Sequence, residues 1–268
     1  MFGRRPDGTL VTDLSAMRRF MPFVSPRRND SLVYFAQDVD AEPGFAFLEK
    51  LNANRPPDRQ VTYFHLVLRA LTRCFAERPR LNRFVAGGRL YQRDGIWMSF
   101  SAKRAFTDDS PVITVKRRMD LDGGLVEMVD AILDKLGAGR RGARTTSDSE
   151  MDILLRLPPP VIRLVLWAAR GLDALGLLPR KMIDADPLFV SGFIANLGSI
   201  GIDAGYHHLW EWGNCPVFGV LGRFETGPDG RRRVTIKWTY EERIEDGFNA
   251  ALCLGLVREG LEQPEKLL

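Results

Sequence analysis

The chain has 268 residues, of which 45% are hydrophobic and 27% are charged, and its formal net charge at pH 7 is +4. This size and composition favour an ordinary soluble globular protein, built as one large domain or two small ones. The 38 basic residues exceed the 34 acidic ones too slightly to indicate a nucleic-acid-binding protein. The surplus suits a solvated surface, a phosphate-bearing small molecule or an acidic partner.

The cysteines, the N-terminus and the lengths of the hydrophobic runs indicate the cellular compartment of the protein. Cys74, Cys215 and Cys253 are odd in number and lack CxxC spacing, so we expect neither a disulfide framework nor a zinc site, and we interpret Cys74 and Cys215 as core thiols. The N-terminus does not read as a signal peptide, and no run of 18 apolar residues predicts a membrane span. A cytoplasmic protein is therefore expected.

The first half of the chain alternates strands and helices. The helices repeat apolar residues at three- and four-residue spacing, and the strands alternate apolar with polar residues. In chain order we predict a strand at 31–43, a helix at 45–55, a helix at 61–82 that Pro79 closes, a hairpin-like section at 83–106, a strand at 111–119 and a helix ending at Gly137.

Two less regular segments follow. Residues 138–149 are the most loop-like stretch of the chain, and we expect a flexible loop there rather than a domain boundary. Prolines break the apolar helical segment 150–180 in two, and its second piece, 161–178, carries few charges. Such a helix is typically buried, packed on a partner, or laid on a membrane surface. The charged residues of this piece are Arg163, Arg170 and Asp173.

The last third is rich in strands. We predict strands at 187–201, 215–225 and 231–243, a turn at 227–230 between the last two, and a final helix at 248–262. Because no GxGxxG or P-loop motif is present, neither a Rossmann fold nor a nucleotide triphosphatase is indicated. The cluster of arginines at 231–233 lacks interleaved aromatic residues, so a solvated turn is favoured over a nucleic-acid site, with contact to coenzyme A phosphates as a minor alternative.

Five segments, in this order, resemble the catalytic domain of the 2-oxoacid dehydrogenase acyltransferases, relatives of chloramphenicol acetyltransferase. They are LSAMRRFM, VTYFHLVLRALTRCFAERPRLN, FIANLGSIGID, CPVFGVLG and YEERIEDG with the helix after it. The resemblance implies one domain over 1–268 with an α/β chloramphenicol acetyltransferase-like fold, a two-layer α+β sandwich with a mixed sheet. We expect no lipoyl or subunit-binding domain ahead of it.

The resemblance also implies a trimer whose active sites lie at subunit interfaces, each a channel entered by coenzyme A and by the acyl acceptor. In the family a histidine deprotonates the attacking thiol or hydroxyl, and a serine or threonine stabilises the oxyanion. Matching the family's DHRxxDG places Glu242 at the histidine position. Matching its TISNLG places Ala195 at the hydroxyl position, next to Asn196.

Both replacements weaken the expected chemistry. A carboxylate is a poorer base than an imidazole by about two pKa units unless burial raises its pKa. Losing one oxyanion donor costs on the order of 3 kcal/mol of transition-state stabilisation. The resemblance gives Asp246 a structural role, as the ion-pair partner of Arg18 or Arg19.

The three histidines are the other candidate bases. His65 lies in an amphipathic helix, where a packed or surface role is favoured. The pair His207 and His208 follows the NLGSIG loop, and it either lines a pocket, as a base, or packs at an interface. Adjacent residues on a strand point apart, so we expect no shared metal site.

Three hypotheses remain open. The first is an acyltransferase-fold protein without the usual mechanism, a pseudoenzyme that binds coenzyme A or acyl-coenzyme A or serves as a trimeric or larger homo-oligomeric assembly subunit. The second is an active acyltransferase that uses Glu242, His207 or His208 as its base. In the third, the segment 161–178 docks the protein on a membrane or a protein partner, so that a cytoplasmic protein would associate with a membrane.

Overall fold

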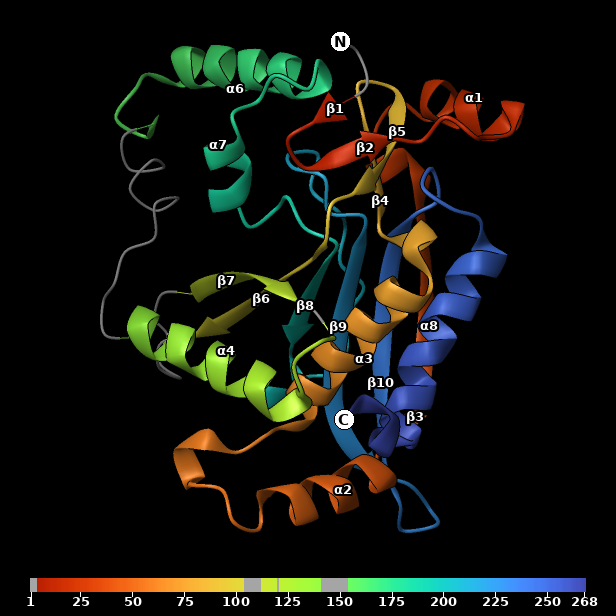
Figure 1. The fold of residues 1–268 in the computed structure, drawn as a ribbon, viewed down its shortest axis with the longest axis vertical. Helices are drawn as coiled ribbons and strands as arrows, with labels where there is room; N and C mark the ends of the chain where they lie inside the picture. The colour runs from red at the N-terminus through yellow and green to blue at the C-terminus, as the bar shows by residue number, and fades with distance from the viewer. Residues whose placement is uncertain (1–3, 104–111, 120, 141–153) are drawn as a thin grey trace.

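A six-stranded mixed sheet forms the centre of the protein (Figure 1). The computed structural model describes residues 4–103, 112–119, 121–140 and 154–268. The sheet order is β3-β10-β9-β8-β6-β7. The strands are β3 (Leu32–Asp40), β6 (Ile96–Lys103), β7 (Val112–Met119), β8 (Gly192–Asn196), β9 (Val217–Thr226) and β10 (Arg232–Glu241).

The direction of the strands makes the sheet mixed. β8 runs parallel to both β6 and β9, whereas the other neighbours are antiparallel. Helices α3 (Tyr63–Glu77) and α8 (Gly247–Glu262) lie side by side and cover one face of it (Figure 1). This arrangement confirms the predicted α/β fold class with a mixed sheet.

A second, four-stranded sheet lies at one end of the molecule. Its order is β1-β2-β5-β4, and α1, α6 and α7 lie at the same end (Figure 1). The elements of this end are β1 (Arg4–Arg5), β2 (Gly8–Leu10), α1 (Ala16–Val24), β4 (Arg83–Ala86), β5 (Arg89–Arg93), α6 (Pro159–Ala174) and α7 (Arg180–Ala185). Two further helices, α2 (Glu42–Asn52) and α4 (Leu125–Arg140), lie toward the opposite end.

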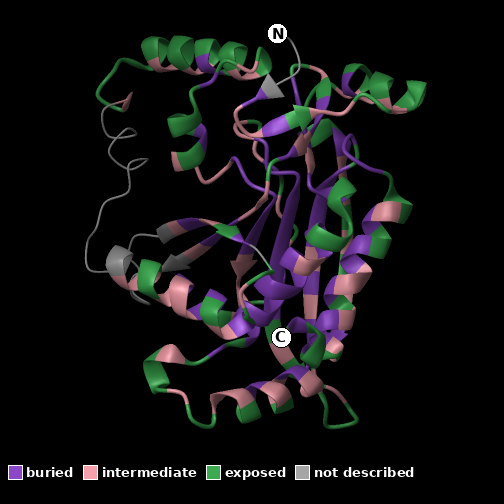
Figure 2. Ribbon diagram, in the orientation of Figure 1, coloured by how far each residue is buried: buried purple, intermediate pink, exposed green. Residues whose placement is uncertain are grey.

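The main core lies between the central sheet and its helical layer, where Figure 2 shows the buried residues concentrated. The alternation expected of a strand holds in β10 from 234 to 238, where Ile236 and Trp238 are fully buried in this core, but not beyond, since Thr239 is buried as well. Gly219 of β9 is required opposite Trp238, since a β-carbon there would overlap the indole ring. The core is so closely packed around the Trp238 ring that this position has no room for one more carbon atom.

Several element boundaries differ from the prediction; the strand predicted at 187–201, for example, is only the five residues of β8. The helix predicted to end at Gly137 continues as α4 to Arg140, so the first residues of the predicted loop 138–149 are helical. The rest of that loop lies outside the described residues. The apolar piece 161–178 is not one helix: α6 ends at Ala174, and a turn with Gly176 at φ +74° leads on to α7.

The expectation that Cys74 is a core thiol is wrong. Cys74 of α3 and Cys253 of α8 form a disulfide across 179 positions of the sequence, and Cys215 is the buried free thiol. The two cysteines meet because α3 and α8 pack against each other on the sheet. Disulfides are typical of oxidising compartments, so the cysteine count no longer supports a reducing cytoplasm.

His65 is a buried residue of α3 and gives the fold a pH dependence. Its Nδ1 accepts a hydrogen bond from the backbone N–H of Thr62 at 3.0 Å, which closes a capping box at the start of the helix. Burial, helped by the charge of Arg55, lowers the pKa of His65 to about 4. Since the pKa in the unfolded chain is about 6.5, the stabilisation is complete above pH ~6.5 and is lost as the pH falls toward the folded value.

We therefore expect the free energy of unfolding to fall by about 2–3 kcal/mol between pH 7 and pH 4.5 because of this one group. The control is His65→Gln, because glutamine can keep the capping box without titrating. Urea unfolding at both pH values measures the difference. Equal losses in the parent and the variant would show that His65 is not the responsible group.

Candidate functional site

The two residues expected at the oxyanion position lie at the end of β8, on opposite sides of the sheet. Ala195 packs in a cluster with Phe193 and Val220 on the face away from α3 and α8. Asn196 borders a cavity on the other side, as expected from the alternation of a strand. Its Oδ1 accepts a hydrogen bond from the N–H of Ser199 at 3.1 Å, which forms the turn after the strand.

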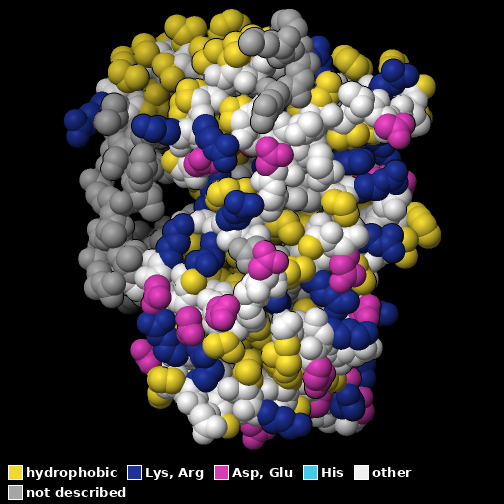
Figure 3. All heavy atoms as spheres, viewed as in Figure 1, with side chains coloured by type: hydrophobic (Ala, Val, Ile, Leu, Met, Phe, Trp, Pro, Cys, Tyr) yellow, Lys and Arg dark blue, Asp and Glu magenta, His cyan; other side chains and the backbone are white. Residues whose placement is uncertain are grey.

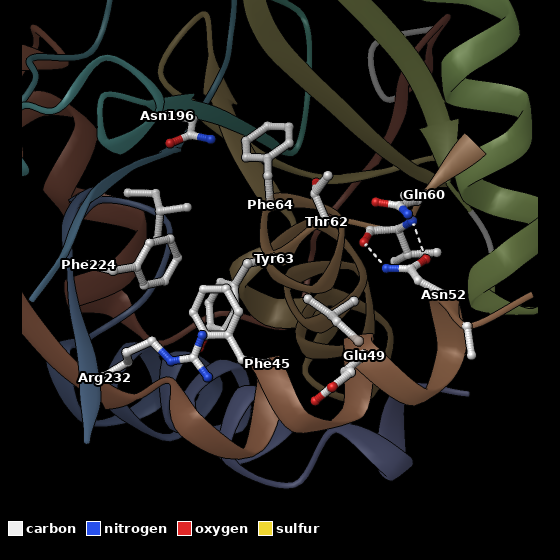
Figure 4. Close-up of a pocket in the computed structure, with 14 residues that line it drawn as sticks. Phe45, Glu49, Asn52, Gln60, Thr62, Tyr63, Phe64, Asn196, Phe224 and Arg232 are labelled. Carbon is white, nitrogen blue, oxygen red and sulfur yellow. Dashed lines mark hydrogen bonds between the residues drawn. The ribbon is translucent and has the colours of Figure 1, made fainter. Parts of the chain in front are cut away.

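The cavity beside Asn196 has a volume of about 720 Å³ and opens between α2, α3 and the ends of β8, β9 and β10 (Figure 4). Its wall is largely apolar and aromatic. The apolar lining residues are Phe45, Leu48, Val61, Tyr63, Phe64, Leu221 and Phe224. A volume of this size is in the range of small-molecule and cofactor sites.

Polar side chains occupy the rim of the cavity. Asn52 exchanges two hydrogen bonds of 2.8 Å with the backbone of Val61, and these fix the loop between α2 and α3 (Figure 4). The Arg232 guanidinium lies 4.0 Å from the centroid of the Phe45 ring and forms a 2.7 Å ion pair with Glu42. The hydrogen bond from Arg232 lowers the pKa of Glu42 to about 2, so this carboxylate stays charged.

The arginine cluster at 231–233 is engaged within the chain. Arg231 pairs with Asp40, and Arg233 pairs with Asp229 at 2.7 Å. Because Arg232 pairs with Glu42, each of the three has a carboxylate partner. The predicted solvated turn fits this arrangement better than a phosphate site.

Glu242, at the position expected for the catalytic histidine, follows β10 and is exposed. Its N–H donates to the carbonyl oxygen of Ser31 at 2.8 Å, and its own carbonyl accepts from Arg18 Nη1 at 2.6 Å. The backbone is therefore held from both sides. In a single copy of the chain its side chain is exposed to solvent.

Beside it, Glu241 is completely buried and binds two arginines. Its carboxylate lies 2.8 Å from Arg28 Nε and 2.6 Å from Arg243 Nη2. Arg28 also donates to the carbonyl oxygens of Trp210 and Gly213. This cluster ties the end of β10 to the segment that carries His207 and His208.

Asp246 lies at the start of α8. It caps α8 by accepting from the N–H of Asn249 at 2.9 Å, and this hydrogen bond is the main cause of the lowered pKa of Asp246. Arg18 forms its ion pair with Glu245, at 3.8 Å, while Arg19 is exposed. A pair between Asp246 and Arg18 or Arg19 stays a prediction, although the charge of Arg18 contributes to the lowered pKa.

The predicted geometry of the histidine pair is wrong. Residues 202–210 form no strand, and the His207 and His208 rings stack with centroids 4.6 Å apart instead of pointing apart. His207 also stacks on Phe218 at 4.2 Å, and its Nδ1 lies 2.6 Å from the His208 carbonyl oxygen. Within the described part of the chain no group of three His, Cys, Asp or Glu residues could hold a metal.

His207 and Ala195 lie on the same face of the sheet, because Ala195 packs in the cluster that contains Phe218. Burial lowers the pKa of His207, so its imidazole is neutral at pH 7. A neutral imidazole can accept a proton. His207 is thus the potential base that this chain itself brings to the side of Ala195.

Glu242 and Ala195 are far apart within one chain. Strand pairing places Ala195 beside Val220, and Val220 beside Lys237. Glu242 lies five residues beyond Lys237, which is about 17 Å along an extended strand. A site that contains both positions requires a second copy of the chain.

Comparison with known proteins gives the fold and little beyond it. No protein-family model and no curated protein sequence matches this chain. Among solved structures, the dihydrolipoamide acetyltransferase of Azotobacter vinelandii aligns with a TM-score of 0.61 at 16% identity, over 96% of this chain and 94% of that chain. Crystallographic and enzymatic work on the Azotobacter enzyme concerns the role of a serine, a histidine and an asparagine in its catalytic mechanism.

Two further structures extend this similarity. The cubic core of the pyruvate dehydrogenase multienzyme complex aligns with a TM-score of 0.60 at 16% identity, over 96% of this chain and 94% of that chain. A chloramphenicol acetyltransferase aligns with a TM-score of 0.52 at 15% identity, over 96% and 98%. The chain therefore has the fold of these acyltransferase cores, and the predicted resemblance is confirmed at that level.

Proposed function

We propose that this protein is a homo-oligomer of acyltransferase-fold subunits that binds coenzyme A or an acyl-coenzyme A in the cavity beside Asn196, without the histidine mechanism of the family it resembles. The observation that carries the proposal is the cavity of about 720 Å³, apolar in its depth and polar at its rim. Such a lining suits a ligand such as coenzyme A, whose extended arm carries both amide and hydrocarbon groups.

The replaced residues support a loss of the usual chemistry. At the positions that the sequence resemblance assigns to the family's serine or threonine and histidine, this chain has Ala195 and Glu242. The asparagine of the Azotobacter enzyme stands four positions after its histidine, and Asp246 stands four positions after Glu242. A methyl group cannot donate to an oxyanion, and an exposed carboxylate is a weak base toward a thiol.

The position of Glu242, about 17 Å along β10 from Lys237, which strand pairing places level with Ala195, supports an oligomer. The pyruvate dehydrogenase core is itself an assembly of similar subunits. A trimer is the arrangement that the resemblance implies. In such a trimer the exposed Glu242 of one copy would face the region of Ala195 on the next.

One alternative is an active acyltransferase. The observation that favours it is the neutral His207 on the face of Ala195. If His207 is the base, His207→Ala lowers the rate of acyl transfer. If Glu242 or His208 is the base instead, Glu242→Gln or His208→Ala, respectively, lowers that rate.

Titration calorimetry with coenzyme A and acetyl-coenzyme A tests the proposal. We expect binding in the micromolar range that Ala53→Trp weakens by about tenfold or more, because a bulky ring at the cavity rim competes with the ligand. Ala251→Trp is the matched control, an equally large change at an exposed position of α8 outside the cavity.

The same samples are assayed for thioester exchange with dihydrolipoamide as acceptor. Binding without exchange supports the proposal. Robust exchange would show that the catalytic machinery works and would favour the active alternative. Absence of binding, or an equal effect of both tryptophans, would rule out the cavity as a coenzyme A site.

A further inference from the structure

Helix α6 presents an apolar side to solvent. The exposed apolar residues on and just after this helix are Val161, Leu164, Val165, Trp167, Leu172 and Leu175. Figure 3 shows hydrophobic side chains gathered over α6 at one end of the molecule. Such residues at helical spacing normally face a core. Here they face outward, and no other element of the described residues covers them; we call this side of the helix the α6 face.

The inner side of α6 is firmly attached, so the helix cannot turn its apolar side inward. Arg5, which is buried, donates to the backbone carbonyl of Asp173 and pairs with its carboxylate at 2.6 Å. Gly87, with φ +55°, packs so closely under the end of α6 that a β-carbon there would overlap the carbonyl of Ala174. Ala169 is buried in the small cluster below.

The charges on α6 are basic and uncompensated. Arg163 and Arg170 are exposed, and neither has a carboxylate partner within the described part of the chain. Asp173 is the acidic residue of the helix, and its carboxylate forms an ion pair with the buried Arg5 on the inner side. Trp167, 73% exposed, adds the kind of side chain that favours the boundary between water and lipid.

We propose that the α6 face docks the protein on an anionic membrane surface, with the helix lying in the plane of the lipid headgroups. None of the described helices is both long and apolar enough to cross a bilayer, and the 16 residues of α6 fit a surface position. A rigidly held helix with an apolar side and arginines among its remaining exposed residues has the pattern of interfacial helices.

A second copy of this chain is a poorer occupant. A two-fold contact joins identical surfaces, so Arg163 and Arg170 of one copy would find no acidic residue on the α6 face of the other. The helix of 16 residues is about 24 Å long and about 10 Å wide, so its side offers roughly 240 Å², well below the ~800 Å² per partner of a stable interface.

Vesicle co-sedimentation of the full chain tests the proposal. We expect binding to vesicles of phosphatidylcholine with phosphatidylglycerol that is about 30-fold stronger than to phosphatidylcholine alone, and that weakens with added salt. The double variant Leu164→Glu with Trp167→Glu is expected to lose at least about tenfold in partitioning. Arg163→Gln with Arg170→Gln should remove the preference for anionic lipid.

The matched controls lie elsewhere on the surface. Phe248 of α8 is also 73% exposed, so Phe248→Glu should leave vesicle binding unchanged, as should Arg258→Gln on the same helix. Circular dichroism confirms that each variant is folded. The proposal is overturned if the parent fails to bind anionic vesicles, or if the α6 and α8 variants behave alike. It is also overturned if the α6 variants change the sedimentation coefficient rather than vesicle binding, since the face would then join copies.

Discussion

Glu241→Gln is expected to destabilise the fold by about 3–5 kcal/mol, because it leaves two buried arginines without their counter-charge. The Glu241 side chain is inaccessible to solvent, and it lies 2.8 Å from Arg28 Nε and 2.6 Å from Arg243 Nη2. When the carboxylate is removed, the free-energy cost of burying the two arginine charges is no longer offset by attraction to it. Glutamine keeps the size of the side chain, so the loss measures charge rather than packing.

Glu242→Gln is the matched control, the same change one residue later in the sequence. Glu242 is exposed, and its backbone makes the hydrogen bonds that fix its position. We expect a change within about 0.5 kcal/mol. Urea unfolding at pH 7 measures both variants, and equal midpoints would contradict the importance given to the buried cluster.

The Glu241→Gln variant should also disturb the segment around His207. Arg28 bridges Glu241 to the carbonyl oxygens of Trp210 and Gly213. Once Arg28 loses its carboxylate, that bridge is weakened. Near-ultraviolet circular dichroism, which senses tryptophan packing, is expected to change before the fold as a whole unfolds.

These two glutamates show what the sequence could and could not predict. The run of strand, turn and helix around them is readable from spacing, and β10 and α8 confirm it. Which glutamate is buried depends on Arg28, which lies 213 positions away in the sequence. A pattern of neighbouring residues cannot carry that information, since it arises only when the chain folds.

The cavity beside Asn196 escaped prediction for the same reason. Its walls come from α2, α3 and three strands that are far apart in the sequence. Helical spacing predicts that the apolar residues of the helices at 45–55 and 61–82 face the interior, but it carries no information on whether a cavity remains between the helices. The expectation that the histidine pair lies on a strand is wrong for a similar reason. Arg28 donates hydrogen bonds to the carbonyl oxygens of Trp210 and Gly213, and the His207 ring stacks on Phe218, so distant residues hold this segment in an irregular conformation.

Opening the Cys74–Cys253 disulfide is expected to lower the free energy of unfolding by about 3–5 kcal/mol. A link across 179 positions removes much of the freedom of the unfolded chain, and a loop of this length lies at the upper end of the usual range. The link also joins α3 to α8, the two helices that cover the central sheet. We expect a reducing agent to lower the urea midpoint of the parent.

The double variant Cys74→Ala with Cys253→Ala separates the link from other effects of the reductant. It should already have the lowered midpoint and should not respond further to reduction, whereas Cys215→Ala should respond as the parent does. Thiol labelling in denaturant, without reductant, should count one thiol in the parent, because Cys215 is the free cysteine. A count of three thiols would mean that the disulfide does not form. The helices α3 and α8 would then be held on the sheet by packing alone, and the expectation from the odd number of cysteines and their spacing would hold after all.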